Sequence, residues 1–408
     1  MKPVPGPLNG YVGIECASYM AGPVATKFLA DMGMRVIRIE PVTGDPSRTF
    51  PAIYGPDCPL TDNVMDVTLH GNKEDISLDL KTEEGQKILH QMCEKADVFL
   101  TNYTLHTLKN LHITYDELHT LNPRLICAYV SGLGEKGKDA GRPGFDITSY
   151  WSRGGTFAQM GDPGSEPMAI LTGQGDNPTG MAVTIGIIAA LLDREKTGKG
   201  CKVTGSLYAT AIWINNLELC ASNYVKINRG SRRLPKSAFT NTYCGSDGLW
   251  FTIALLQPPQ QFPVLCEALG NPDLAKDPRF KDTKSMYDNR AELVEEIEKM
   301  FSKYTRPEIE KILTAARLPY EVHQTFDDIL HDQQALDNEY LVPVEYPYGT
   351  VLSPTIPVKI DRYGTTTANN KAVAQGAQTV EILKDLGYSD AEIAEMEADK
   401  IIVAAHEA

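Results

Sequence analysis

The chain has 408 residues, of which 42% are hydrophobic and 23% are charged, and its formal net charge is −14. Its length allows two domains, or one large domain with an insertion, and its composition is ordinary for a globular protein. The acidic excess argues against nucleic acid or an anionic membrane surface as a partner, so an anionic small molecule would need a local basic patch.

The first half of the chain alternates between short apolar runs rich in β-branched residues and segments with helical spacing. Strands are expected at residues 11–17, 35–40, 98–102, 124–132 and 201–207, and helices at 22–33, 82–97 and 115–123, with another beginning near Asp176. Thr82 precedes two glutamates and is expected to cap its helix. This alternation predicts right-handed βαβ units and a parallel sheet, in which ligands bind at the carboxyl ends of the strands.

The pattern changes after residue 222. A hairpin is expected at 241–255, followed by helices at 260–269, 290–303 and 306–317, extended segments at 340–346 and 356–360, and a C-terminal helical region broken at Gly387 and restarted by Ser389. We therefore predict a large domain that begins with residues 1–222, a small domain at 223–325, and a segment at 326–408 that returns to the large domain.

Common cofactor and catalytic signatures are absent. The string "GLGEKG" follows an expected strand, but three helix breakers come after it, which argues against a dinucleotide site. There is no CxxC pair among the eight cysteines, and no Walker A, GxSxG or HExxH string. The N-terminal stretch "MKPVPGPLNG" lacks an apolar signal segment. We expect a cytoplasmic protein that binds no metal.

The stretch "LTGQGDNPTGMAVTIGIIAALLDREKTGKG" runs from a glycine-rich turn into a long apolar helix, with Asp176 in the turn. An aspartate before a helix usually accepts hydrogen bonds from the first backbone N–H groups. However, Gly173, Gly175 and Gly180 leave more space around this carboxylate than a cap requires. A carboxylate can also attack an activated acyl group, and glycine N–H groups can bind the resulting oxyanion.

Taken together, these segments resemble the family III CoA-transferases, the group of formyl-CoA:oxalate transferase and the carnitine CoA-transferase. The resemblance spans nearly the whole chain. Its carriers are "AGPVATKFLADMGMRVIRIEPVTGDPSR", "NKEDISLDLKTEEGQKIL", "ADVFLTNY", "NPRLICAYVSGLGEKG", "PGFDITSYWSRGG", "GDNPTGM", "AALLDREKTGKG" and "LKDLGYSDAEI". The "PGFD" string and the second domain are most similar to the transferases for 2-hydroxyacyl-CoA or aryl-lactate substrates.

The resemblance implies an α/β fold with a Rossmann-like large domain and a smaller inserted α+β domain, in an interlocked homodimer. It implies an acyl-CoA and a small carboxylic acid as substrates, with no permanently bound cofactor. Asp176 would be the nucleophile, with Asp146 and Gly175 in positioning roles. Residues implied to contact CoA are Cys16, Ala17, Lys73, Asn102, Tyr103, Lys109 and Arg142. Lys73, in "GNK", is expected at a loop facing the CoA cleft.

Two alternatives remain open at this stage. Acyl-CoA racemases share the fold, but they need an acid/base pair and carry a histidine where this chain has Phe145. A CoA-binding protein without turnover would bind CoA tightly whether or not Asp176 is intact. The formyl-CoA enzymes also carry an arginine where this chain has Pro41, and glycines in the small domain that "GSDGLW" and "LLQPPQQF" replace. These departures argue against oxalate as the acceptor.

Overall fold

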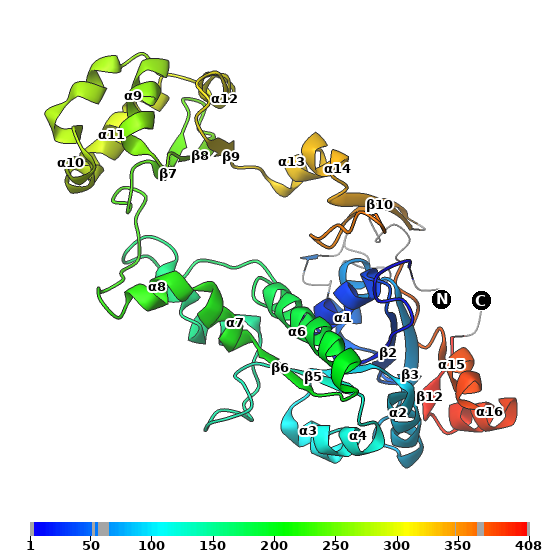
Figure 1. The fold of residues 1–408 in the computed structure, drawn as a ribbon. Helices are drawn as coiled ribbons and strands as arrows, with labels where there is room; N and C mark the ends of the chain where they lie inside the picture. The colour runs from blue at the N-terminus through cyan, green and yellow to red at the C-terminus, as the bar shows by residue number, and fades with distance from the viewer. Residues whose placement is uncertain (1–3, 51–53, 56–64, 347, 365–370, 406–408) are drawn as a thin grey trace. The chain divides into compact units, whose positions relative to one another are not determined.

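The computed structural model describes residues 4–50, 54–55, 65–346, 348–364 and 371–405. The chain divides into two compact units (Figure 1). The first comprises Met1–Thr156, Ile170–Leu219 and Asp332–Ala408, and the second comprises Phe157–Ala169 and Cys220–His331. The second unit thus covers the segment where the sequence predicts a small domain, and it also takes in residues 157–169. That excursion contains the glycine- and proline-rich run "GDPGSEP", but nothing local in the sequence links it to the segment after residue 219.

A mostly parallel sheet forms the centre of the first unit. Within the described residues it has seven strands in the order β12-β3-β2-β1-β4-β5-β6, and only β12 runs antiparallel. The strands are β1 (Val12–Cys16), β2 (Arg35–Glu40), β3 (Lys73–Leu78), β4 (Val98–Thr101), β5 (Ile126–Ser131), β6 (Lys202–Ser206) and β12 (Ile402–Val403). The chain order reverses between β1 and β4, and in such sheets the crevice beyond this point is where ligands bind. The α/β prediction with a parallel sheet is confirmed.

Helices cover both faces of this sheet (Figure 1). On one face α1 packs against α6, and the Thr184 hydroxyl donates to the Ala25 carbonyl over 3.2 Å. The opposite face is covered by α2, α3, α4, α15 and α16, whose leucines and isoleucines join those of the strands in one core. The bounds are α1 (Ala21–Asp31), α2 (Glu83–Lys95), α3 (Leu105–Asn110), α4 (Tyr115–Leu121), α6 (Asp176–Thr197), α7 (Leu207–Ile214), α8 (Asn216–Ala221), α14 (Gln333–Asp337), α15 (Thr379–Leu386) and α16 (Asp390–Ala398).

The second unit is α+β and has its own aromatic-rich core, which includes Phe251, Phe262 and Phe301. Its strands pair antiparallel in the order β7-β8-β9, as the predicted hairpin requires. The elements are β7 (Thr240–Cys244), β8 (Trp250–Ala254), α9 (Pro258–Ala268), α10 (Thr283–Asp288), α11 (Arg290–Phe301), α12 (Arg306–Ala315), β9 (Tyr320–Val322) and α13 (Phe326–Leu330). Helix α5 (Thr156–Gln159) lies where the two units divide.

Local signals in the sequence agree with the structure at several helix ends. The Thr82 hydroxyl accepts a hydrogen bond from the Gly85 N–H, Gly387 ends α15 with a φ of 100°, and Ser389 caps α16. Of the two extended segments expected near the C-terminus, the first forms β10 (Leu341–Tyr346), which pairs with β11 (Gly349–Pro354), and residues 356–360 form no strand. Among the helices of the described residues, none combines the length and apolar character that a membrane span needs.

The prediction for Lys73 is wrong in its placement. Lys73 is the first residue of β3 and is buried, with 1% of its surface exposed. Its ammonium donates to the Glu15 carboxylate over 2.6 Å, to the Pro23 carbonyl over 2.9 Å and to the Thr26 hydroxyl over 2.9 Å. Burial lowers the pKa of Lys73 to about 8, against the effect of Glu15. A lysine with three internal partners is a structural residue and does not face a loop cleft.

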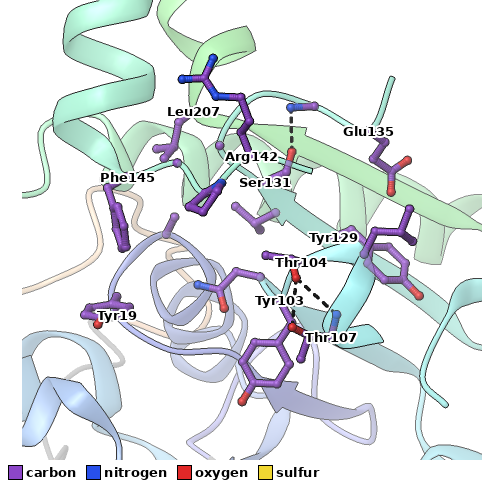
Figure 2. Close-up of a pocket in the computed structure, with 18 of the residues that line it drawn as sticks. Tyr19, Tyr103, Thr104, Thr107, Tyr129, Ser131, Glu135, Arg142, Phe145 and Leu207 are labelled. Atoms are coloured by element: carbon purple, nitrogen blue, oxygen red, sulfur yellow. Dashed lines mark hydrogen bonds between the residues drawn. The ribbon is translucent and has the colours of Figure 1, made fainter. Parts of the chain in front are cut away.

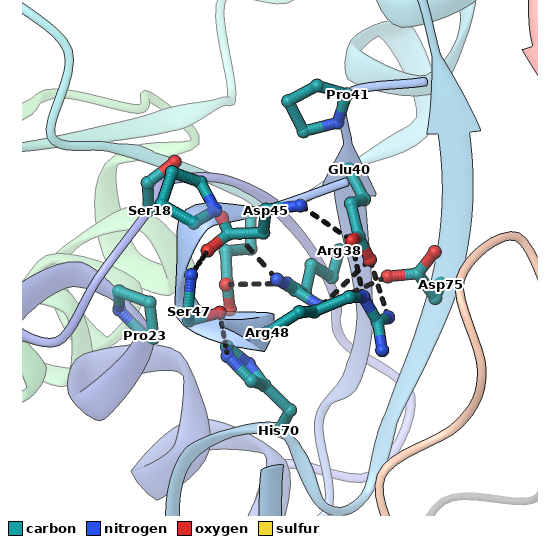
Figure 3. A network of polar contacts seen from close by, with 12 residues as sticks. Ser18, Pro23, Arg38, Glu40, Pro41, Asp45, Ser47, Arg48, His70 and Asp75 are labelled. Carbon is teal, nitrogen blue, oxygen red and sulfur yellow. Dashed lines mark hydrogen bonds and ion pairs between the residues drawn. The ribbon is translucent and has the colours of Figure 1, made fainter. Parts of the chain in front are cut away.

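Through Glu15, Lys73 is linked to a buried charge network on the inner strands β1, β2 and β3, and Figure 3 shows the part of it around Arg38. At its centre the buried guanidinium of Arg38 lies 3.1 Å from Glu40, 3.3 Å from Asp75 and 3.4 Å from Asp45. Arg38 also lies 3.8 Å from Glu15, the carboxylate that holds Lys73. Removing one member of such a set leaves an opposite charge in a site with little water, which is strongly destabilising.

The buried ammonium yields a stability prediction. Lys73→Ala should lower the free energy of unfolding by about 3 kcal/mol or more, because the Glu15 carboxylate would lose its ammonium partner inside the protein. Lys109→Ala provides the control, since Lys109 is exposed on α3 and should change stability by no more than about 0.5 kcal/mol. Thermal unfolding followed by circular dichroism measures both variants. A Lys73→Ala protein with unchanged stability and a raised KM for acyl-CoA would contradict the structural role.

Candidate active site

The glycine-rich turn before α6 is pressed against its neighbours. Gly173 has a φ of +80°, and a Cβ placed on it would lie 2.5 Å from the methyl group of Met20. A Cβ on Gly175 would lie 2.3 Å from the Tyr150 ring and 2.4 Å from the Asp146 carboxylate. At Gly175 these distances leave no room for a side chain, and at Gly173 the left-handed φ would strain any other residue, so the turn adopts this path because glycine occupies both positions.

Asp146 holds this turn in place. It begins a π-helix, Asp146–Arg153, that the sequence did not reveal, and such helices are frequent at functional sites. Its carboxylate oxygen Oδ1 accepts a hydrogen bond from the Gly175 N–H over 2.9 Å. Burial raises the pKa of Asp146, while the backbone N–H groups of the turn oppose the rise. Because the Gly175 N–H is donated to Asp146, it is not free to bind an oxyanion, which corrects the expectation for this glycine.

Asp176 is the first residue of α6 and does not cap it. The N-cap position is Gly175, and no side-chain hydrogen bond caps the helix. Within the described part of the chain, the Asp176 carboxylate has no hydrogen-bond or ion-pair partner. Burial raises the pKa of Asp176 to about 7, and the nearby Asp146 carboxylate adds to the rise. An unpaired, partly desolvated carboxylate is a better nucleophile than a solvated one, and a perturbed pKa in a cavity is typical of functional sites.

Asp176 faces a cavity of about 570 Å³ in the first unit. The cavity lies beyond the carboxyl ends of β1, β4 and β5, at the place where the strand order predicts a ligand. Figure 2 shows residues around it that come from β5 and from the segments that follow β1, β4, β5 and β6. The lining includes Ser18–Ala21, Asn102–Leu105, Thr107, Tyr129–Gly132, Gly134–Lys136, Arg142–Phe145, Asp176, Lys202 and Leu207.

The structure brings three of the predicted CoA-contacting residues to this cavity. Asn102 ties two of its loops together: its side chain accepts from the Ser18 N–H over 3.1 Å and donates to the Ser18 carbonyl over 2.6 Å. Tyr103 and Arg142 also line the cavity, and Arg142 donates to the Asp139 carboxylate over 3.2 Å. Whether these residues contact CoA stays a prediction.

Three further residues predicted to contact CoA do not line this cavity. Lys109 is exposed on α3 and does not line the cavity, which takes Leu105, Thr107 and Leu108 from that helix. The side chains of Cys16 and Ala17 are buried below the loop that follows β1, and burial raises the pKa of the Cys16 thiol to about 12. Residues 18–21 reach the cavity instead. A shift of one residue along this loop changes which side chains are exposed, and the sequence pattern is too coarse to predict that shift.

Sequence reasoning missed two basic residues and one tyrosine. Lys136 and Lys202 line the same cavity as Asp176, and Lys202 lies 2.7 Å from the Glu135 carboxylate and over the Tyr129 ring. Tyr19 also lines the cavity. The sequence did contain a feature that could have identified Lys136, because this residue lies in the glycine-rich segment directly after an expected strand. Lys202 was harder to identify from the sequence, because it begins a strand and does not follow one.

Comparison with known proteins gives a consistent result. The model of "CoA-transferase family III" matches residues 8–376. The (R)-2-hydroxy-4-methylpentanoate CoA-transferase of Clostridioides difficile is 33% identical over 396 residues, covering 97% of this chain and 99% of that protein. The cinnamoyl-CoA:phenyllactate CoA-transferase of Clostridium sporogenes is 34% identical over 406 residues, covering 97% of both proteins. A solved CAIB/BAIF family protein from Brucella suis has a TM-score of 0.81 at 28% identity, covering 94% of this chain and 100% of that one.

The raised pKa of Asp176 predicts a stability change with a definite pH dependence. Between the ordinary value of 3.8 and the folded value of about 7, the folded protein keeps a proton that the unfolded chain releases. Stability contributed by this group therefore falls as pH rises through that window. Asp176→Asn, which is always neutral, should match the natural protein in melting temperature at pH 4 and exceed it by about 3 °C or more at pH 8.

Melting temperatures measured across pH 4 to 9 test this expectation. Asp193→Asn is the matched control, because Asp193 is exposed on the same helix and should alter the melting temperature little at any pH. A difference between Asp176→Asn and the natural protein that stays constant with pH, or a less stable variant at pH 8, would refute the desolvated carboxylate.

Proposed function

Since this chain belongs to CoA-transferase family III, we propose that it moves CoA from a donor thioester to an organic acid through covalent intermediates on Asp176. The observation that carries the proposal is the unpaired Asp176 carboxylate, which is raised in pKa and faces the cavity. Cys16 is a buried thiol with a pKa of about 12, so it is a poor competitor for the role of nucleophile.

In the first step, an Asp176 oxygen attacks the carbonyl carbon of the donor thioester. The carbon–sulfur bond breaks, CoA leaves as the thiolate, and an aspartyl–acyl mixed anhydride forms. The thiolate then attacks the aspartyl carbonyl, giving an aspartyl-CoA thioester and the free donor acid. Alternatively, the acceptor carboxylate attacks that carbonyl first, which releases the donor acid and forms a mixed anhydride with the acceptor. In either order each step is an acyl transfer, so the energy of the thioester is kept in a covalent bond. Excluding water from the cavity prevents hydrolysis of these intermediates.

Asp146 supports this step as a positioning residue. Its carboxylate holds the Gly175 N–H and so fixes the turn that carries Asp176. Its negative charge also helps to keep the pKa of Asp176 high, which favours a more nucleophilic carboxylate once the proton is lost. Gly175 contributes by its lack of a side chain, which allows the turn to approach both Asp146 and Tyr150.

The cations at the cavity are suited to the CoA phosphates. Lys136, Arg142 and Lys202 all line it, whereas Lys73 is held inside the protein. A protein with a net charge of −14 gives no long-range attraction to CoA, so binding must rely on such a local cluster. We assign the phosphate contacts to these three residues, with Asn102 and Tyr103 lining the path toward Asp176.

For the substrates, we propose 2-hydroxy acids with aryl or branched aliphatic side chains and their CoA thioesters. The support comes from the named activities of the two curated relatives, which act on 2-hydroxy-4-methylpentanoate and phenyllactate. An α-proton exchange like that of the racemases has less support, because Phe145 lines the cavity where an acid/base side chain would be needed.

We further propose a homodimer that acts in the cytoplasm. Large apolar side chains are exposed on α6, α7 and α8, among them Ile185, Trp213 and Leu217, and a second copy of the chain would cover them. The cysteines of the described residues are all free thiols, as is usual in a reducing compartment. Light scattering of the purified protein measures the assembly state directly, and a monomer at micromolar concentration would refute the dimer.

An acid panel tests the proposed function. Purified protein is incubated with several acyl-CoA donors and several free acids, and the new thioesters are identified by mass. We expect exchange among 2-hydroxy acids, reduced on the order of a thousandfold or more by Asp176→Ala and unchanged by Asp193→Asn. Loss of an α-deuterium label without acid exchange would indicate a racemase. Tight CoA binding with no exchange in any combination would indicate a binding protein.

A further inference from the structure

Two aromatic rings from different loops meet at the cavity that Asp176 faces. Tyr19 follows β1, Phe145 precedes the π-helix, and their rings pack edge to face with centroids 5.7 Å apart and planes at 86°. Both residues line the cavity, and Figure 2 shows them facing each other, away from the part that contains Tyr129 and Glu135. The cavity therefore has an aromatic end and a more polar end.

Chain connections place the aromatic end beside the nucleophile. Phe145 directly precedes Asp146, whose carboxylate binds the N–H of the residue before Asp176. Tyr19 directly precedes Met20, whose methyl group lies 2.5 Å from where a Cβ on Gly173 of the turn would be. Each ring is thus one residue from a contact with the turn that carries Asp176. The two rings and Asp176 line the same cavity.

The backbone of Tyr19, at the aromatic end of the cavity, is strained. Its φ of 63° lies in the left-handed region, which is unfavourable for a bulky side chain. The residue before it is held on both its N–H and its carbonyl by Asn102, so the strain is fixed by its surroundings. Backbone strain of this kind clusters at functional sites because something other than stability maintains it.

The two rings retain apolar surface that no part of the first unit covers. Tyr19 is 40% exposed and Phe145 is 53% exposed, although they pack against each other. Binding becomes more favourable when a ligand displaces water from apolar surface in a cavity. Neither ring carries a charge that could pair with a second carboxylate, so the surface suits an apolar side chain better than a dicarboxylic acid.

We propose that Tyr19 and Phe145 form the surface that selects the acyl group, favouring 2-hydroxyacyl thioesters with a phenyl or branched aliphatic side chain over those with a methyl group. This inference rests on the proposed CoA transfer. The pair acts by contact with the side chain of the acyl group and takes no part in breaking or forming the thioester.

The test is an exchange assay that needs no knowledge of the natural acceptor. Each of three thioesters, phenyllactoyl-CoA, 2-hydroxy-4-methylpentanoyl-CoA and lactoyl-CoA, is mixed with its own isotope-labelled acid, and kcat/KM for label entering the thioester is measured. Phe145→Ala should lower the phenyllactoyl-to-lactoyl ratio of kcat/KM by about tenfold or more, with lactoyl exchange changed by less than about threefold.

Tyr19→Gly separates selectivity from folding. Glycine adopts a positive φ without strain, so this variant should melt at the same or a higher temperature than the natural protein while losing the aromatic ring. Its phenyllactoyl-to-lactoyl ratio should fall as in Phe145→Ala. Tyr287→Ala is the control, because Tyr287 is 55% exposed in the second unit and outside the cavity, and its ratio should not change.

The outcomes are decisive in each case. A natural protein that exchanges none of the acids refutes the proposed function and the inference with it. A natural protein that exchanges them, with a ratio unchanged in Phe145→Ala and Tyr19→Gly, refutes only the inference. Equal losses for all three thioesters in variants with normal melting temperatures also overturn it, because they show a general role. A shift in assembly state without a shift in ratio assigns the rings to a subunit contact instead.

Discussion

The hydrogen bond from the Gly175 N–H to the Asp146 carboxylate is the contact on which the rest of the site depends. It is possible only because no Cβ separates the turn from Asp146 and Tyr150. With the turn held there, α6 begins at Asp176, which lines the cavity and does not cap its own helix. Burial and the neighbouring charge of Asp146 then raise its pKa to about 7. One contact thus fixes the position of the proposed nucleophile, next to the charge that adds to its raised pKa.

Charge is used in two separate ways in the first unit. Arg38 and Lys73 are buried among carboxylates and stabilise the sheet around β2 and β3. Lys136, Arg142 and Lys202 line the cavity, where a ligand can reach them. An acidic protein that binds an anionic thioester needs this division, because its overall field repels the ligand and only the local cations attract it.

Much of the fold could be predicted from the sequence, because hydrophobic periodicity and capping residues act locally. The strand at Arg35–Glu40 and the Thr82 cap are examples. Lys73 could not be placed in this way, since its partner Glu15 is 58 positions away and nothing local marks the pair. The Asp146–Gly175 contact joins two loops 29 positions apart and has no periodic signal either. Asp176 could be proposed as the nucleophile from the sequence because its glycine-rich turn is a local pattern that also carries the family resemblance.

Direct detection of a covalent adduct tests the central claim, that Asp176 is the nucleophile. The protein is incubated with an acyl-CoA that it exchanges, quenched with borohydride or hydroxylamine, digested, and analysed by mass spectrometry. The account predicts a modification on the peptide that contains Asp176, dependent on the thioester and absent from Asp176→Asn. Modification of a different residue, or rapid exchange with no adduct under conditions that trap an aspartyl thioester, would contradict it.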